Sequence, residues 1–155
     1  MTAPPITGVS EIVLSVSDLP AMRKFYSEVL GFAVHSERSM ETEAADPNGE
    51  PTICFLTISE TPTPLHRAGH PQLLALIDYK RHVYAKRFVG HDVAKSTLNH
   101  LAFEIPTDSY ADHLNRLRDL GLDVSEAEFP AMGAKATFFS DPEENRLELI
   151  CPQPL

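Results

Sequence analysis

The chain has 155 residues, 43% of them apolar, which is enough to bury one ordinary core or two small fused modules. Its formal net charge of −9 argues against a nucleic-acid partner, because neutralising phosphates requires a basic surface. No apolar stretch is long enough to span a membrane, and the first residues lack the pattern of a secretory signal. We therefore expect a cytoplasmic protein without a membrane partner, whose Cys54 and Cys151 are buried and reduced.

The first half of the sequence predicts the order β-α-β-β-β. Residues 8–16 alternate as a strand, and Ser17 or Asp18 can cap the following helix, with Pro20 in its first turn. Gly31 then supplies a left-handed residue at the helix end. The apolar stripe of this helix is Met22, Phe25, Tyr26, Val29 and Leu30. Three more strands are expected, beginning at residues 32–35 and then at 52–59 and 72–79, with a turn at 46–49 and a proline-rich segment at 61–71.

The second half predicts the same order in a more compact form. Residues 98–105 form a strand, Thr107 or Asp108 caps a helix, and Gly121 ends it. The stripe of this helix is Tyr110, Leu114, Leu117 and Leu120. Three further strands are expected at residues 122–125, 134–139 and 146–151, with a turn at 141–145. An interval of about 90 residues separates Glu11 from His100 and also Gly31 from Gly121, so the chain contains a duplicated strand–helix unit.

Residues 80–95, between the two halves, are locally basic. They hold five of the thirteen Lys and Arg residues, against the single acid Asp92. Two interpretations remain open: a solvated linker, or a basic loop that attracts an anionic substrate. Together with the turn-rich segment 36–50, this segment is a candidate lid over a site.

Strand alternation predicts that three metal-capable side chains lie on the sheet faces away from the helices. Glu11, His100 and Glu148 each fall on the mixed face of their strand, whereas the opposite faces are uniformly apolar. One histidine and two carboxylates leave open positions on a divalent ion, as in catalytic sites. Each residue alone also fits a polar position on a half-exposed strand. The correspondence between the two copies is what favours a shared site.

Four stretches of the chain resemble a known family. They are Glu11-Ile-Val-Leu-Ser-Val-Ser-Asp-Leu, Tyr26-Ser-Glu-Val-Leu-Gly31-Phe, Asn99-His-Leu-Ala-Phe-Glu-Ile and Phe139-Ser-Asp-Pro-Glu-Glu-Asn-Arg-Leu-Glu148-Leu-Ile. With them the chain resembles the vicinal oxygen chelate superfamily over about residues 8–152. That group includes glyoxalase I, fosfomycin and bleomycin resistance proteins, methylmalonyl-CoA epimerase and extradiol ring-cleaving dioxygenases.

The resemblance implies an α+β fold of two βαβββ modules that form a mixed-sheet cleft, with the helices on the outer face. The chain would be one domain, residues 1–155, with modules at about 8–79 and 98–152 and a linker at 80–97. Members of this kind usually form homodimers, and their modules can pair within a chain or across the dimer. At residue 144 the chain has Glu where the family commonly has Gly.

The resemblance also implies a ligand set. His100 and Glu148 match two family ligand positions directly, and Glu11 stands where many members have His or Gln. Aligning residues 73–77 with 146–150 puts Ala75, which cannot bind metal, at the fourth position. A divalent ion (Mg, Mn, Zn, Ni or Fe) would then be held by Glu11, His100 and Glu148, and the added carboxylate favours redox-inert metals.

The expected function is therefore a divalent-metal-dependent lyase or isomerase that acts on a small oxygen-bidentate substrate, which can be anionic. Glu104, four residues after His100 and on the same face of its strand, is the candidate base. Two alternatives remain: an extradiol-type ring-cleaving dioxygenase, and a metal-free protein that binds or sequesters a small molecule, like the bleomycin resistance members.

Overall fold

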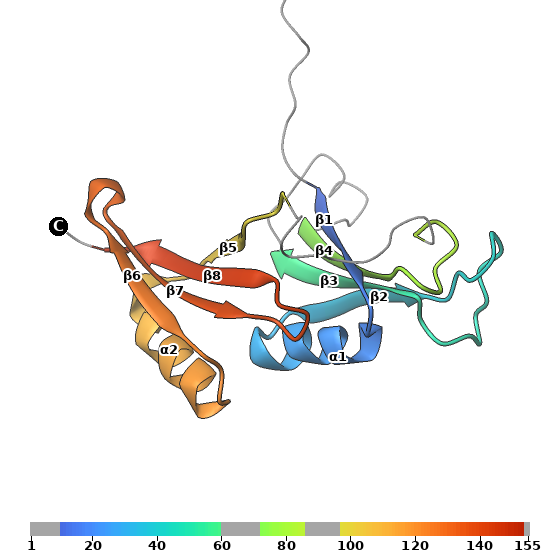
Figure 1. Ribbon diagram of the computed structural model, residues 1–155, viewed down its shortest axis with the longest axis horizontal. Coiled ribbons are helices and arrows are strands. Elements are labelled where there is room, and N and C mark those ends of the chain that lie inside the picture. The colour runs from blue at the N-terminus through green and yellow to red at the C-terminus, as the bar shows by residue number, and fades with distance from the viewer. Residues whose placement is uncertain (1–9, 60–71, 86–96, 154–155) are drawn as a thin grey trace, which may run out of the picture. The chain divides into compact units, whose positions relative to one another are not determined.

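Both halves of the chain fold in the predicted order, each as a helix against a four-stranded mixed sheet (Figure 1). The computed structural model describes residues 10–59, 72–85 and 97–153. The chain divides into two units, Met1–His91 and Asp92–Leu155, and the boundary falls within the segment expected to be a linker. The proline-rich residues 61–71 and most of the basic segment lie outside the described residues.

The first unit has the strand order β1-β4-β3-β2, in which β1 and β4 are parallel and the other pairs antiparallel. Its elements are β1 (Glu11–Val16), α1 (Leu19–Lys24), the π-helical η1 (Phe25–Val29), β2 (Ala33–Arg38), β3 (Ile53–Ser59) and β4 (Gln72–Asp78). Because β1 and β2 lie at opposite edges of the sheet, α1 carries the chain across it between them.

The start and end of the first helix follow the predicted signals. The Asp18 carboxylate accepts a hydrogen bond from the Ala21 backbone N–H at 3.0 Å, and Pro20 lies in the first turn. Gly31 has a φ of +75°, the left-handed conformation that glycine adopts without strain. Between these points the helix widens into η1, which the sequence did not predict. The Ser27 hydroxyl donates to the Arg23 carbonyl at 2.8 Å, a local bond that competes with regular helical pairing.

One face of the first sheet carries the core of its unit. Leu14, Cys54 and Leu76 lie side by side on adjacent strands and are almost completely buried. Met22 and Tyr26 pack on this side and are fully buried. Cys54 and Cys151 are both free and buried, as predicted.

The second unit has the equivalent strand order, β5-β8-β7-β6, with β5 and β8 parallel. Its elements are β5 (Leu101–Glu104), η3 (Thr107–Ser109), α2 (Tyr110–Asp119), β6 (Ser125–Phe129), η4 (Pro130–Met132), β7 (Ala134–Ser140) and β8 (Arg146–Pro152). Leu114 and Leu117 of α2 are buried, whereas Leu120 is exposed, contrary to the predicted stripe.

Three boundaries in the second unit differ from the predictions. The first strand begins at Leu101, so His100 immediately precedes it. The next strand begins at Ser125, because the Leu122 N–H is used to close the helix end on the Leu117 carbonyl at 3.1 Å. Thr107 does not cap the helix, since its hydroxyl donates to the Pro152 carbonyl at 2.9 Å.

The turn before β8 was predicted correctly and is built around a buried aspartate. One oxygen of Asp141 accepts from the N–H groups of Glu143 and Asn145, at 3.0 and 2.9 Å, and the other accepts from the Asn145 amide at 2.7 Å. Glu144 has a φ of +67°, the one positive value at a non-glycine residue in the described part of the chain. The turn thus imposes a left-handed conformation where the family commonly has Gly.

Among the described residues, no helix has the length and apolar character needed to cross a membrane.

Candidate functional site

The strand registers of the two units match position by position on the faces away from the helices. Ala75 on β4 lies between Val13 on β1 and Phe55 on β3. In the second unit Glu148 lies in the same way between its two neighbours, Ala102 on β5 and Phe138 on β7. The register therefore confirms that Ala75 occupies the position equivalent to Glu148.

In the second unit, a histidine side chain is in contact with a buried carboxylate. His100 Nε2 lies 3.0 Å from Glu148 Oε2, with 36% of the histidine side chain exposed and 6% of the glutamate side chain. Glu148 is brought under His100 because β5 and β8 are parallel neighbours and Glu148 pairs with Ala102, two residues beyond His100. Two of the residues predicted from the sequence are thus in direct contact.

The other ring nitrogen of this histidine is also engaged. His100 Nδ1 lies 2.7 Å from Asn99 Oδ1, which can only accept, so the imidazole donates from Nδ1. Nε2 is then the nitrogen that faces the carboxylate, either with a second proton or with its lone pair. Such an outer partner is what fixes the orientation of a metal-binding histidine.

An aromatic and cationic surface continues from this pair. The ring of Phe138 meets His100 edge-on, with centroids 5.9 Å apart, and the guanidinium carbon of Arg146 lies 4.8 Å from the Phe138 centroid. A small cavity of about 160 Å³ adjoins Phe138 and Arg146 and is also lined by Ser125. Asn99 and Phe138 were not among the site residues predicted from the sequence. Strand alternation could have identified Phe138, because it points to the same face as Glu148.

The remaining two candidates lie apart from any cluster within their own units. Glu11 is exposed at the start of β1, opposite Leu73. Glu104 is exposed at the end of β5, opposite Ile150. Within either unit, the residues that the structure describes form no group of three or more His, Cys, Asp or Glu side chains suited to a metal. The assignments of Glu11 as a ligand and of Glu104 as a base therefore stay predictions.

The donor set of His100 and Glu148 fits a divalent cation. The Glu148 carboxylate is buried, yet the described residues provide a partner for only one of its oxygens. A buried charge with an unsatisfied oxygen is costly, and a cation would satisfy it. Ligand atoms that each lie about 2.1 Å from one metal, at right angles, are about 3 Å apart, which agrees with the observed separation.

The basic segment between the halves is only partly described. Its described cations, Lys80 and Arg81, donate hydrogen bonds within the first unit. Arg81 donates to Glu41 from Nε and a terminal nitrogen, at 2.9 and 2.6 Å. Lys80 Nζ donates to the Ser17 carbonyl at 3.2 Å. Arg81 thus ties the turn-rich segment 36–50 to the end of β4.

Comparisons with known proteins agree with this fold. The family model described as the glyoxalase/bleomycin resistance protein/dioxygenase superfamily matches residues 8–149. The chain belongs to this superfamily, which defines the class of protein. No significant match is found among curated protein sequences.

Solved structures with the same fold share few residues with this chain. The fosfomycin resistance protein FosX from Listeria monocytogenes is 19% identical, with a TM-score of 0.63 and 96% of each chain covered. One structure of FosX contains Mn(II) and 1S,2S-dihydroxypropylphosphonic acid. A lactoylglutathione lyase from Agrobacterium tumefaciens is 18% identical, with a TM-score of 0.57 and 95% of each chain covered. The antibiotic-binding protein TnmS3 from Streptomyces sp. CB03234 is 20% identical, with a TM-score of 0.59 and coverage of 97% of this chain and 100% of that one.

Proposed function

We propose that the protein is a divalent-metal-dependent enzyme with lyase or isomerase chemistry on a small oxygen-bidentate substrate. His100 and Glu148 would hold the metal, with Glu11 as the third protein ligand, and the open positions would take the substrate oxygens. The contact between His100 Nε2 and Glu148 Oε2 carries this proposal, because it presents two donor atoms at a separation suited to one ion. The Mn(II) in FosX supports the same class of cofactor.

The residues around this pair would orient the ligands and the substrate. Asn99 holds the imidazole so that Nε2 faces the site, and Phe138 limits the movement of the ring at its edge. A bound divalent ion would polarise a substrate oxygen. Glu104 would then remove or deliver a proton at a neighbouring carbon, since its carboxylate is exposed on the same side of β5 as Ala102.

The first test measures metal binding without reference to activity. We expect metal-stripped protein to bind Mn(II) at one site per chain in isothermal titration calorimetry. His100→Ala and Glu148→Gln should each abolish this binding, whereas His35→Ala, at an exposed histidine on β2, should leave it unchanged. Full Mn(II) occupancy in His100→Ala would refute the ligand assignment.

The second test concerns the reaction. Manganese-loaded protein would be assayed for consumption of fosfomycin and for lactoylglutathione lyase activity, the functions that two structural relatives carry in their names. Glu104→Gln should lower kcat while metal affinity stays the same, because a base acts on the substrate and not on the metal. Oxygen uptake with a catechol after iron loading would instead indicate ring-cleaving dioxygenase chemistry.

One observation favours a second candidate, a metal-free protein that binds a small molecule. A protonated His100 and Glu148 can form an ion pair without a metal, and TnmS3 is described as an antibiotic-binding protein. Absence of stoichiometric binding of Mn(II), Zn(II), Ni(II) and Fe(II) to reconstituted wild-type protein would decide for this candidate.

A further inference from the structure

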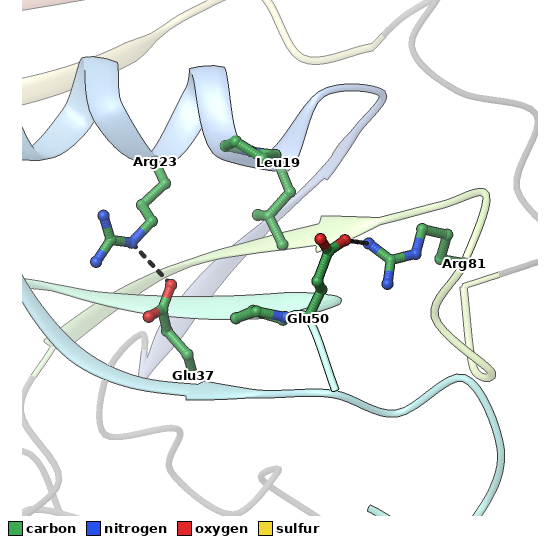
Figure 2. A pocket seen from close by; sticks show the side chains of 7 residues that line it. Leu19, Arg23, Glu37, Glu50 and Arg81 are labelled. Carbon is green, nitrogen blue, oxygen red and sulfur yellow. Dashed lines mark hydrogen bonds and ion pairs between the residues drawn. The ribbon is translucent and has the colours of Figure 1, made fainter. Parts of the chain in front are cut away.

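The first unit contains a second cavity, of about 340 Å³, on the face of its sheet that α1 covers (Figure 2). Glu37 lines it from β2 and pairs in register with Cys54 of the buried core. Glu11 belongs to the opposite face of the same sheet, as strand alternation from Leu14 shows. Glu11 therefore does not line this cavity.

Two ion pairs flank Leu19 in this cavity, one on each side (Figure 2). On one side, Arg23 Nε donates to Glu37 Oε1 at 2.8 Å. The guanidinium also forms a side-chain hydrogen bond with the Cys54 thiol. Arginine has five N–H donors, so three remain beyond those used by Glu37 and Cys54. They can bind a carboxylate side by side.

The other side of the cavity presents an available carboxylate. Glu50 lies 3.4 Å from a terminal nitrogen of Arg81, and 86% of its side chain is exposed. Arg81 is already bound more closely by Glu41. Glu50 is therefore only loosely held and can accept hydrogen bonds from an ammonium group.

The charges and the walls together define the ligand. The charges of Arg23 and Glu37 cancel on one side, where guanidinium donors remain. On the other side Arg81 is shared by Glu41 and Glu50, which leaves a net negative charge there. A molecule with both charges would match the free donors of one side and the free acceptor of the other. Leu19 and Pro51 add apolar surface. The volume lies at the lower end of the range for small-molecule sites, about 300–1,000 Å³.

The Cys54 thiol, fully buried next to the Arg23–Glu37 pair, carries no charge. Burial, with a further contribution from Glu37, raises the pKa of the Cys54 thiol to about 12, so it stays protonated at neutral pH. The Cys54 thiol therefore adds no charge to those of the ion pairs.

We propose that this cavity is a second binding site, for a small zwitterion of the α-amino acid class with an apolar side chain. The terminal nitrogens of Arg23 bind its carboxylate, Glu50 binds its ammonium group, and Leu19 and Pro51 contact its side chain. The site goes beyond the proposed metal-dependent function and does not depend on it.

The test uses three matched probes with the full chain, in the absence of metal. L-leucine carries both charges, 3-methylbutan-1-amine lacks the carboxylate, and 4-methylpentanoate lacks the ammonium group. We expect saturable binding of leucine in calorimetry and at least about tenfold weaker binding of each analogue, because each loses a charge-assisted contact. Absence of leucine binding, or equal binding of an analogue, would overturn the proposal.

Variants then assign the binding to this cavity. Arg23→Gln and Glu50→Gln should each weaken leucine binding by about tenfold or more. Arg118→Gln is the matched control, since Arg118 is an exposed arginine of the second unit paired with Glu126 at 2.7 Å. Glu50 is exposed, so its variant keeps the fold and stays informative if Arg23→Gln does not fold. Undiminished leucine binding in Glu50→Gln would reject the site.

Discussion

Asn99 accepts a 2.7 Å hydrogen bond from the imidazole of His100, the residue that follows it in the chain. The bond uses Nδ1 and leaves Nε2 directed at the buried carboxylate of Glu148. It thereby selects the ring orientation and the tautomer that a metal ligand at Nε2 requires.

Asn99→Ala should weaken Mn(II) binding by about 10- to 100-fold without abolishing it, because the imidazole loses its outer partner but both ligand atoms remain. Asn99→Asp should restore most of the affinity, since a carboxylate accepts the same bond. Calorimetry measures both, with Asn115→Ala, at an exposed position on α2, as the control. An unchanged affinity in Asn99→Ala would show that the bond has no part in orienting the ligand.

Glu144→Gly should stabilise the protein by about 0.5–1 kcal/mol, because Glu144 adopts a φ of +67° that costs a side-chain-bearing residue energy and costs glycine little. The gain is measured by urea unfolding, as an increase in the midpoint at constant slope. Glu143→Gly is the matched control in the same turn and should destabilise, since its φ is not positive. A loss of stability in Glu144→Gly would mean that the Glu144 side chain makes a compensating contribution.

Protein stability should fall as the pH is lowered through about 6.5, and His82 should account for part of this fall. His82 is 3% exposed, its ring Nδ1 accepts the Tyr84 N–H at 3.2 Å, and burial lowers its pKa from the ordinary 6.5 against a smaller opposing effect of Asp78. The unfolded chain therefore binds a proton at a higher pH than the folded one. The contribution of His82 is fully present above 6.5 and is lost as the pH falls toward the lowered pKa.

The measurement is the free energy of unfolding at several pH values between 5 and 8. His82→Gln should flatten the slope below pH 6.5, whatever its effect at pH 8, whereas His35→Gln, at an exposed position, should keep the wild-type slope. An identical slope in wild type and His82→Gln would show that other groups cause the acid sensitivity.

The sequence predicted the element order of both units and the face on which His100 and Glu148 meet. Those predictions held because period-two alternation and glycine at helix ends are local signals that the packing did not override. Alignment of residues 73–77 with 146–150 identified Ala75 as the counterpart of Glu148, and the strand registers place the two residues equivalently.

Other features depended on contacts that no local pattern encodes. The π-helical segment Phe25–Val29 interrupts a regular apolar stripe, and Thr107 bonds to Pro152, 45 residues away, instead of capping its helix. The orientation of His100 by Asn99 depends on a rotamer, which a sequence does not specify. The cavity between Arg23 and Glu50 joins a helix to a distant loop, so it becomes visible only in the folded unit.

The matched registers of the two sheets give the chain two copies of one backbone position with different side chains, a methyl group at Ala75 and a carboxylate at Glu148. A substitution at Ala75 or at its neighbour Phe55 changes the shape of its sheet face without removing a charge. Most substitutions at Glu148 remove the charge itself. With the proposed metal site, we therefore expect new specificities to arise by changes at Ala75 and Phe55, while Glu148 is retained, so that duplication has left one of two equivalent positions able to vary.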